Sequence, residues 1–348
     1  MSRRLGPAIT AAFIALPEML AFPLGGRPRA FQRGAEAGWE RPRDERRAPR
    51  PSPPRGGGGE KPRWQGEARG RQQESWPAEE ASPPAWRVEA AELGAEFVYG
   101  VNPVLAALRH GRRKVHRLLV QDSIVAERRK DGAAVERAEA LAAAAGVEVL
   151  RVDKHRLNLV CDHRPHQGLA ILCEPLAFAP MAQMPPAAEG VPLWLALDEV
   201  SDPQNLGALL RSAYFLGVEG VLVSAKNSAP LSPAVSKASA GAVELMEVFA
   251  ARNLPKLLEE ARHKGWQVVG AAMENSVEPH EVDRARPTIL VLGSEGRGLR
   301  TNVLRACDSL VCVPGGLAED SDEAELVDSL NVSVAGGILL YALLHGRA

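Results

Sequence analysis

The apolar run Leu193-Trp-Leu-Ala-Leu197 constrains the fold of this chain more than any other segment. Five apolar residues without alternation suit a strand that is buried on both faces, as in a parallel sheet covered by helices. Asp202-Pro203, which can start a helix, follows this run, and Gly217 can end that helix. A second apolar segment comes at 221–223. The sequence therefore predicts a βαβ unit, with its helix over 205–216.

The same alternation continues towards the C-terminus. We predict a helix over 253–264 and strands over 267–271, 288–292 and 310–313. Strands that alternate with helices favour a parallel sheet with helices on both faces. Residues 192–348 are therefore expected to form one α/β domain.

A smaller α/β module is predicted over residues 92–177. A Pro-rich connector, 178–191, separates it from the larger domain. Its predicted elements are a turn and helix over 97–108, a strand at 115–120, a helix at 133–145 closed by Gly146, and a strand at 147–152.

The N-terminal part of the chain differs from the rest in charge. Residues 1–90 hold 16 Lys and Arg against 11 Asp and Glu, whereas residues 91–348 hold 26 against 32. Residues 31–91 contain almost no aliphatic side chains and cannot bury enough apolar area to order themselves, so we predict a disordered linker. Its arginines could contact RNA phosphates, but interleaved Glu favours a solvated spacer.

Residues 1–30 are rich in Arg and apolar side chains, and Glu18 is their only acid. This composition is typical of a mitochondrial presequence, while a secretory signal or an inert extension remains open. Pro17 and Glu18 interrupt the apolar stretch, which is too short to span a bilayer. We predict a targeting segment for the mitochondrial matrix and no membrane span.

The chain holds four irregularly spaced cysteines, too few for a disulfide scaffold. Cys161, His163, His166 and Cys173 include possible zinc ligands, but their spacing matches no familiar zinc site, and we predict no metal. The basic runs 112–114 and 128–130 are either solvated charges or contacts to RNA phosphates.

Three polar clusters lie where strands of the predicted sheet end, the edge at which open α/β sheets bind ligands. They cover residues 198–211, the Gly-rich turn 293–299, and the run Ser329-Leu-Asn-Val-Ser-Val-Ala335. The glycine spacing of the turn is G-x-x-G-x-G, not the G-x-G-x-x-G of dinucleotide folds, and no P-loop pattern occurs. Dehydrogenase and NTPase functions are therefore disfavoured.

The order and spacing of these clusters resemble the three motifs of the SpoU/TrmH family, 2'-O-ribose RNA methyltransferases of the SPOUT superfamily. The run Lys237-Ala-Ser-Ala-Gly-Ala242, together with Tyr99-Gly100-Val-Asn102 and His166-Gln167-Gly168, resembles the rRNA branch of this family. The resemblance implies an N-terminal L30e-like RNA-binding module and a C-terminal SPOUT domain with a trefoil knot. It also implies S-adenosylmethionine as cofactor, a homodimer, and methylation of a guanosine in mitochondrial large-subunit (16S) rRNA, free or in an assembling ribosomal large subunit.

The resemblance also assigns site residues. The cofactor pocket is expected to be lined by Gly293, Glu295, Gly296, Val313, Pro314, Leu330 and Asn331. The expected catalytic set is Arg211, Asn205, Glu295, Ser329 and Asn331. Because a guanidinium keeps its proton, Arg211 is expected to stabilise negative charge on the ribose oxygen rather than act as a base, and Asn205 is expected to orient it.

Two other functions remain open at this stage. A catalytically silent rRNA-binding or ribosome-assembly protein could use the same fold, and a tRNA 2'-O-methyltransferase could use the same motifs. The acidic stretch 317–328 departs from the family pattern. We interpret it as a mobile surface insertion, although it could also repel misplaced RNA or contact a partner.

Overall fold

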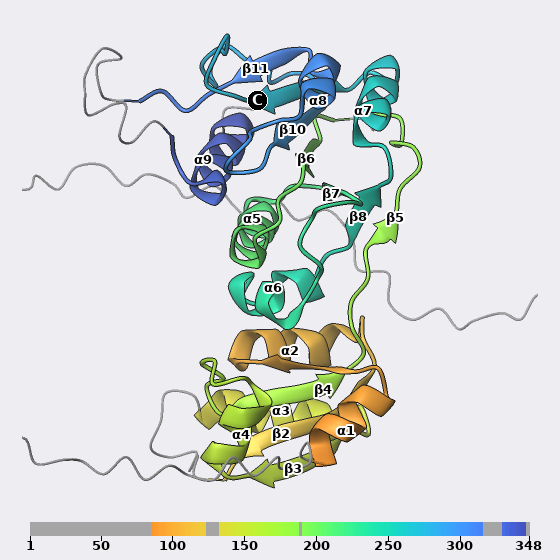
Figure 1. Ribbon diagram of the computed structural model, residues 1–348, viewed down its shortest axis with the longest axis vertical. Helices are drawn as coiled ribbons and strands as arrows, with labels where there is room; N and C mark the ends of the chain where they lie inside the picture. The colour runs from red at the N-terminus through yellow and green to blue at the C-terminus, as the bar shows by residue number, and fades with distance from the viewer. Residues whose placement is uncertain (1–84, 123–131, 188–189, 316–328, 346–348) are drawn as a thin grey trace, which may run out of the picture. The chain divides into compact units, whose positions relative to one another are not determined.

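The computed structural model describes residues 85–122, 132–187, 190–315 and 329–345, and these belong to one compact unit. The predictions for residues 1–30, 128–130 and 317–328, and for most of the linker, lie outside the described residues. Figure 1 shows the element order along the chain, from α1 to α9.

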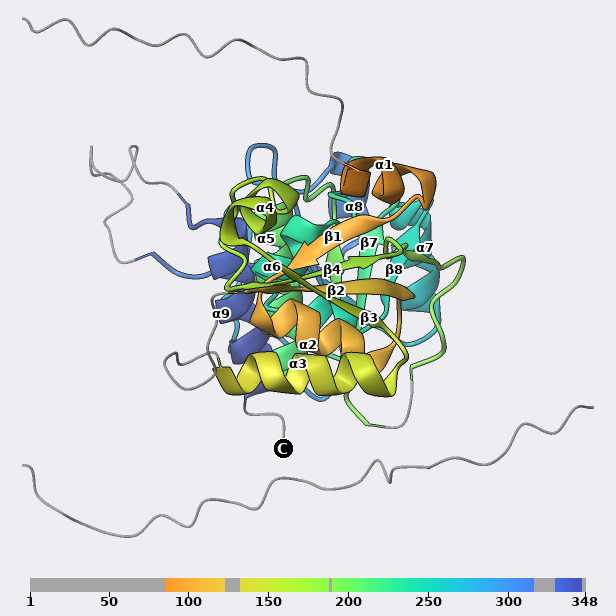
Figure 2. The same cartoon turned by 90° about the horizontal axis from the view of Figure 1, so that it is seen from below.

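The N-terminal module contains a four-stranded mixed sheet of order β1-β4-β2-β3. Its strands are β1 (Glu96–Tyr99), β2 (Val115–Gln121), β3 (Glu148–Val152) and β4 (Leu169–Cys173). Helices α2 (Val101–His110) and α3 (Gly132–Ala144) cover one face, and α1 (Ala85–Glu92) and α4 (Lys154–Val160) lie on the other, as Figure 2 shows.

This module differs from the sequence prediction in three places. Residues 97–99 belong to a strand and not to a turn, and the sequence interpretation missed α4 and β4. The last residues of the predicted linker form α1, so the prediction of disorder is wrong for residues 85–91. The reason is tertiary: Trp86 packs edge-on against Phe97 at 5.6 Å, a contact that composition cannot reveal.

The C-terminal domain contains a seven-stranded sheet of order β11-β9-β10-β6-β7-β8-β5, in which every neighbouring pair is parallel. Its strands are β5 (Ala179–Pro180), β6 (Leu193–Leu197), β7 (Gly220–Ser224), β8 (Val248–Ala251), β9 (Gln267–Ala271), β10 (Thr288–Leu292) and β11 (Ser309–Val311). The predicted parallel α/β sheet is confirmed. The connector 178–191 also contributes β5 to the sheet edge, and β8 was missed.

Helices cover both faces of this sheet. The helices are α5 (Pro203–Leu216), α6 (Pro233–Ala238), α7 (Leu254–His263), α8 (Thr301–Ala306) and α9 (Val332–Leu344), with a 3₁₀ turn, η2, at Ala242–Glu244. The α5 and α9 helices pack on one face, and α7 and α8 pack on the other (Figure 1). None of the described helices is long and apolar enough to cross a membrane.

Local signals in the sequence correctly predict both the start and the end of α5. The Asp202 carboxylate accepts a hydrogen bond from the Gln204 backbone at 3.0 Å, which caps the first turn. Gly217 adopts φ 80°, the left-handed conformation that ends helices. Close packing of α9 also needs a glycine, because a Cβ at Gly336 would lie 2.5 Å from Leu209.

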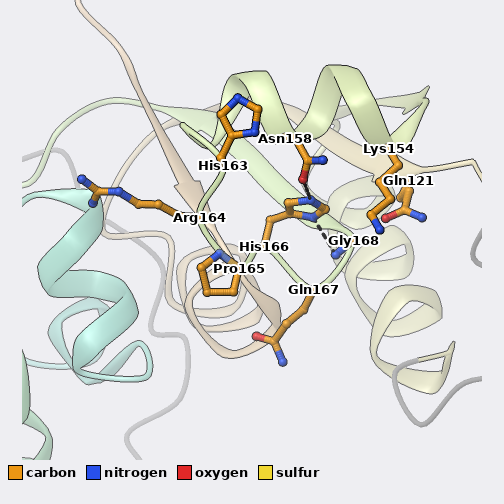
Figure 3. Close-up of a pocket in the computed structure, with 9 residues that line it drawn as sticks. All are labelled: Gln121, Lys154, Asn158, His163, Arg164, Pro165, His166, Gln167 and Gly168. Carbon is orange, nitrogen blue, oxygen red and sulfur yellow. Dashed lines mark hydrogen bonds between the residues drawn. The ribbon is translucent and has the colours of Figure 1, made fainter. Parts of the chain in front are cut away.

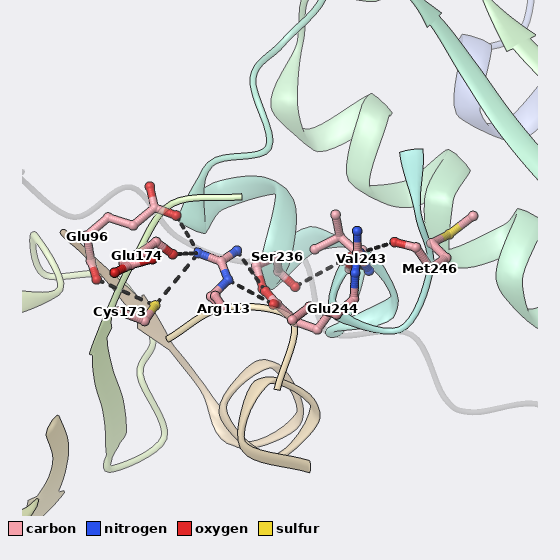
Figure 4. A network of polar contacts seen from close by, with 10 residues as sticks. Glu96, Arg113, Cys173, Glu174, Ser236, Val243, Glu244 and Met246 are labelled. Atoms are coloured by element: carbon pink, nitrogen blue, oxygen red, sulfur yellow. Dashed lines mark hydrogen bonds and ion pairs between the residues drawn. The ribbon is translucent and has the colours of Figure 1, made fainter. Parts of the chain in front are cut away.

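A buried ion pair joins the N-terminal module to η2 of the C-terminal domain. Arg113 donates to both carboxylate oxygens of Glu244 at 2.9 Å, and neither side chain is exposed to solvent. Figure 4 shows that Glu96 also accepts from Arg113 and that Ser236 donates to Glu244. Burial acts to lower the pKa of the Arg113 guanidinium, but its carboxylate partners raise it overall.

The basic run 112–114 therefore has a different role from both sequence interpretations. Arg113 is neither solvated nor free to contact RNA, because its donors are used within the protein. Arg112 donates to the backbone oxygens of Val243 and Met246. These two arginines hold the module against the larger domain.

Candidate active site

The candidate site lies at the point where the strand order of the large sheet changes direction. From β6, the chain continues through β7 and β8 on one side, while β10 pairs with β6 on the other. Both strands are parallel, so their carboxyl ends meet at one edge, where crevices for ligands form. The first polar cluster follows β6, and the glycine turn follows β10.

The glycine turn after β10 is closed on itself. Ser294 and Gly298 exchange two backbone hydrogen bonds of 3.1 and 2.9 Å. A Cβ at Gly293 would lie 2.2 Å from the carbonyl carbon of Gly298, so closure of the turn requires a glycine at this position. Gly298 has φ 63°, and the Cβ position of Gly296 is open space.

A buried carboxylate anchors the far end of this turn. The Asp198 side chain is fully buried, and it accepts from the Arg300 backbone at 3.0 Å and from the Arg300 Nε at 2.8 Å. The hydrogen bond to Asp198 raises the pKa of Arg300. The sequence interpretation placed Asp198 in the motif but missed Arg300, whose partner lies 102 residues away.

Three predicted site residues, one from each cluster, meet in a triangle. The Asn205 Nδ2 donates to Glu295 Oε1 at 2.5 Å, and the Asn331 Nδ2 donates to the same oxygen at 2.5 Å. The Asn331 Nδ2 also donates to Asn205 Oδ1 at 3.0 Å. The fold thus brings together residues that lie 90 and 126 positions from Asn205 in the sequence.

Asn331 is the N-cap of α9 as well as a member of the triangle. Its Oδ1 accepts from the Ser333 backbone at 2.9 Å, so the polar partner required at the start of an apolar helix comes from the backbone. Both amide atoms are then occupied. In contrast, Glu295 Oε2 accepts no hydrogen bond from any described residue, and Glu295 is exposed.

The remaining predicted pocket residues lie on two segments at the same sheet edge. Val313 is half-buried and Pro314 is exposed after β11, while Ser329 and Leu330 are exposed directly before Asn331. Leu330 is 49% exposed, an apolar side chain beside a polar triangle. Open space at Gly296, an exposed apolar side chain and a carboxylate oxygen that has no partner among the described residues fit a ligand such as S-adenosylmethionine, which has apolar and hydroxyl groups.

Arg211 lies apart from the triangle. It is exposed on α5, and its position six residues after Asn205 corresponds to a rise of about 9 Å along the helix. No described residue forms a hydrogen bond or an ion pair with it. The expectation that Asn205 orients Arg211 is therefore wrong within one chain, because the Asn205 amide is bound to Glu295 and Asn331.

An apolar surface surrounds Arg211. Helices α5 and α9 pack against each other and expose large apolar side chains, of which Phe215 is 86% exposed. We define the α5–α9 face by these exposed side chains: Tyr214, Phe215, Val334, Ile338 and Tyr341. Exposed apolar surface of this size commonly marks an interaction site.

The suggested zinc ligands do not form a site. Burial raises the pKa of the Cys161 and Cys173 thiols to about 12, which keeps them protonated. Both ring nitrogens of His166 are engaged, with the Gly168 backbone and with Asn158. Among the described residues, no group of three or more His, Cys, Asp or Glu side chains is arranged to hold a metal ion.

Comparisons with known proteins match most of the described residues. Residues 192–341 match the SpoU rRNA Methylase family, and residues 97–179 match the RNA 2'-O ribose methyltransferase substrate binding domain. The chain is 39% identical to human "rRNA methyltransferase 1, mitochondrial" over 274 residues, covering 72% of this chain and 73% of the relative.

Two further relatives extend the comparison. The chain is 37% identical to the "23S rRNA (guanosine-2'-O-)-methyltransferase RlmB" of Pseudomonas syringae, covering 73% of this chain and 96% of the relative. An AdoMet-bound rRNA methyltransferase from Sinorhizobium meliloti has a similar fold, with a TM-score of 0.57 at 25% identity, covering 74% of this chain and 89% of that one. The matched regions include every cluster of the site, and the chain belongs to the SpoU rRNA methylase family of SPOUT methyltransferases.

Proposed function

We propose that this enzyme transfers a methyl group to the ribose 2'-oxygen of a guanosine in mitochondrial large-subunit (16S) rRNA. The observation that carries the proposal is the triangle of Asn205, Glu295 and Asn331, which joins all three family motifs at the switch point of the sheet. Relatives named as guanosine-2'-O-methyltransferases and as mitochondrial rRNA methyltransferases support the substrate.

The methyl donor is S-adenosylmethionine, which supplies an electrophilic methyl group when bound. We expect Gly296, Leu330 and the backbone of the turn to contact it. Asn205 and Asn331 hold Glu295 Oε1, so that Oε2 faces the ligand with a fixed orientation. A preorganised acceptor of this kind positions a ribose hydroxyl without reorganisation during the reaction.

Arg211 supplies positive charge to the RNA side of the reaction. As the 2'-oxygen bonds to the methyl carbon, the bond from that carbon to the donor's sulfur would break, and its electron pair would stay on sulfur. The hydroxyl proton passes to a phosphate oxygen or water, and Arg211 stabilises the negative charge that develops on the 2'-oxygen. Arginine suits this role because its planar donors bind phosphate in a bidentate geometry and it does not release its own proton.

We further propose a homodimer built on the α5–α9 face. Arg211 is exposed beside Tyr214 and Phe215, and a two-fold interface here would cover these apolar side chains. In such a dimer, Arg211 of one copy faces the triangle of the other. This arrangement explains why Arg211 and Asn205 do not meet within one chain.

The cellular site is proposed to be the mitochondrial matrix. The Arg-rich composition of residues 1–30 and the relatives named as mitochondrial support it. Fusion of these residues to a fluorescent protein tests it: mitochondrial fluorescence is expected, and a secreted or purely cytosolic signal contradicts it. An assembling ribosomal large subunit as substrate and the trefoil knot also remain predictions; part of the chain between β11 and α9 lies outside the described residues.

The proposed activity is tested with purified protein, labelled S-adenosylmethionine and transcripts of mitochondrial large-subunit rRNA. We expect one 2'-O-methylguanosine in this rRNA, and none in mitochondrial tRNA. Label in tRNA alone would favour a tRNA enzyme. RNA binding without any methyl transfer would instead indicate a silent assembly factor.

A further inference from the structure

A cavity in the N-terminal module lies outside the candidate active site. It has a volume of about 330 Å³ and is formed between α4 and the loop that precedes β4. Figure 3 shows Lys154 and Asn158 on one side and His166 and Gln167 on the other. Its volume lies at the lower end of the range for small-ligand pockets, roughly 300 to 1,000 Å³, so it suits one small group and not a helix.

Hydrogen bonds in this cavity fix the orientation of Asn158. The Gly168 backbone donates to His166 Nδ1 at 2.9 Å, so the ring proton must sit on Nε2. The Nε2 then donates to Asn158 Oδ1 at 2.9 Å. Burial lowers the pKa of His166, and the nearby lysines, Lys154 and Lys237, act in the same direction, so the ring stays neutral. The Asn158 NH₂ group is left without an acceptor among the described residues.

Hydrogen bonds also fix the orientation of the Gln167 side-chain amide. Lys237 of the larger domain donates to Gln167 Oε1 at 2.8 Å, and the Val101 backbone donates to the same oxygen at 3.4 Å. The oxygen is therefore occupied, and no described residue accepts from the Gln167 NH₂ group. Gly100 makes room for this contact, since a Cβ there would lie 2.5 Å from the Lys237 Nζ.

Three donor groups that line the cavity, alongside Gln121, donate to no described residue. These are the NH₂ groups of Asn158 and Gln167 and the ammonium of Lys154, and no carboxylate is among the described lining residues. The nearest acids are engaged elsewhere: Asp153 caps α4, and Asp162 pairs with Arg87. Such an array fits a ligand rich in acceptors, as the carbonyls of a base and the oxygens of a phosphate are.

Backbone strain is concentrated around this cavity. Asp162, His163 and Gln167 have φ of 50°, 58° and 55°, a left-handed conformation that non-glycine residues rarely adopt. Strain of this kind persists where the surrounding structure holds it and is concentrated at binding sites. The strained loop is the segment that carries His166 and Gln167 to the cavity.

From these contacts we propose that the cavity binds one unpaired nucleotide of the rRNA substrate, distinct from the guanosine that is methylated. The base accepts from Asn158 and Gln167, and its phosphate lies near Lys154. Because Lys237 ties Gln167 to the larger domain, the bound nucleotide is held at a fixed distance from the triangle. The cavity thereby selects which guanosine reaches the active site. This inference rests on the proposed function, since it takes the substrate to be RNA.

The test compares two substitutions on α4. Each removes one positive charge, but only one of the two residues lines the cavity. Lys154→Ala removes a cation that lines the cavity, whereas Arg156→Ala removes an exposed cation of the same helix that does not. A third variant, Asn158→Asp, keeps the acceptor for His166 and removes the NH₂ donor. Dissociation constants are measured at one salt concentration with a methylatable rRNA fragment, because non-specific phosphate binding depends strongly on salt.

We expect Lys154→Ala and Asn158→Asp to raise the dissociation constant by roughly three- to tenfold, as loss of one hydrogen bond does, with Arg156→Ala within about twofold of the parent. Arg156→Ala should also leave the maximal rate at saturating RNA unchanged. Equal effects of Lys154→Ala and Arg156→Ala, with no effect of Asn158→Asp, would overturn the proposal.

Ultraviolet crosslinking of the full chain to the same RNA identifies the occupant. A crosslink between residues 163–168 and a nucleotide other than the methylated guanosine supports the proposal. A crosslink there only to the methylated guanosine, or none, overturns it. If the protein binds the RNA but does not methylate it, the proposed function fails. The dissociation constants of the variants relative to the parent still decide whether the cavity binds RNA.

Discussion

Two arginines of this chain lie in opposite surroundings. Arg113 is fully buried, and its donors are bound by Glu244, Glu96 and a backbone oxygen. Arg211 is exposed, and no described residue binds it. A charge whose partners are all internal serves the structure, since a buried charge is tolerated only when it is paired. A charge that is exposed and has no partner among the described residues is open to solvent, and we propose that it serves the substrate.

The first way to break this comparison is to remove the buried arginine. Arg113→Ala leaves the Glu244 carboxylate buried without its partner, so we expect the free energy of unfolding to fall by about 3 to 5 kcal/mol. Chemical denaturation measures this loss. Lys114→Ala is the matched control, because it removes a neighbouring, exposed cation. Equal destabilisation by the two variants would contradict the assigned role of Arg113.

The second prediction concerns the exposed arginine. Arg211→Ala should lower kcat by a factor of roughly 10² to 10³, the usual cost of one preorganised charge stabiliser, with little change in unfolding or in S-adenosylmethionine affinity. Arg211→Lys should also fail if bidentate phosphate binding matters. Single-turnover methyl transfer measures the effect, and a rate within about threefold of the parent would refute the role of Arg211.

A third, smaller effect is expected in the triangle. Asn331→Asp keeps the acceptor that caps α9 but removes the donor to Glu295 and places two carboxylates side by side. Misplacement of Glu295 should lower kcat by roughly ten- to a hundredfold. Ser333→Ala, which removes only a hydroxyl donor to Asn331, serves as control and should remain active. Normal turnover by Asn331→Asp would show that the triangle does not position the reaction.

The smallest effect concerns pH. Burial holds the pKa of His166 below its ordinary value of 6.5, so the unfolded chain binds a proton that the folded chain does not. The free energy of unfolding therefore falls as the pH drops below 6.5. Above that pH His166 is neutral in both states, and it no longer makes stability depend on pH. When the pH is lowered from 7.5 to 5, the Tm of His166→Gln should fall less than the Tm of the parent. Identical losses in scanning calorimetry would contradict this linkage.

The sequence predicted elements well where one local signal decided them. The unbroken apolar run defined β6, Gly217 ended α5, and Asp202 capped it. The family motifs correctly identified Asn205, Glu295 and Asn331 as neighbours. Pattern alone could not reveal pairs such as Arg113 with Glu244, which are 131 residues apart and look like ordinary surface charges. A periodic pattern carries no information about such distant partners.

The same limit explains the interpretation of Gly293. The sequence placed Gly293 and Gly296 together in the expected cofactor pocket. The structure shows that Gly293 makes room for the backbone of Gly298, whereas the Cβ position of Gly296 is open. Only the coordinates distinguish a glycine needed for turn closure from one needed for binding. The position of Arg211 likewise could not be judged until the direction of α5 was known.

Mixed dimers test the shared active site most directly. Arg211→Ala and Asn331→Ala subunits, each inactive as a homodimer, are refolded together with different affinity tags, and heterodimers are purified through both tags. If Arg211 of one copy serves the triangle of the other, each heterodimer regains one intact site and about half of the parental activity per dimer. No recovery in heterodimers that bind S-adenosylmethionine, or a parental protein that is monomeric at its working concentration, would contradict the shared site.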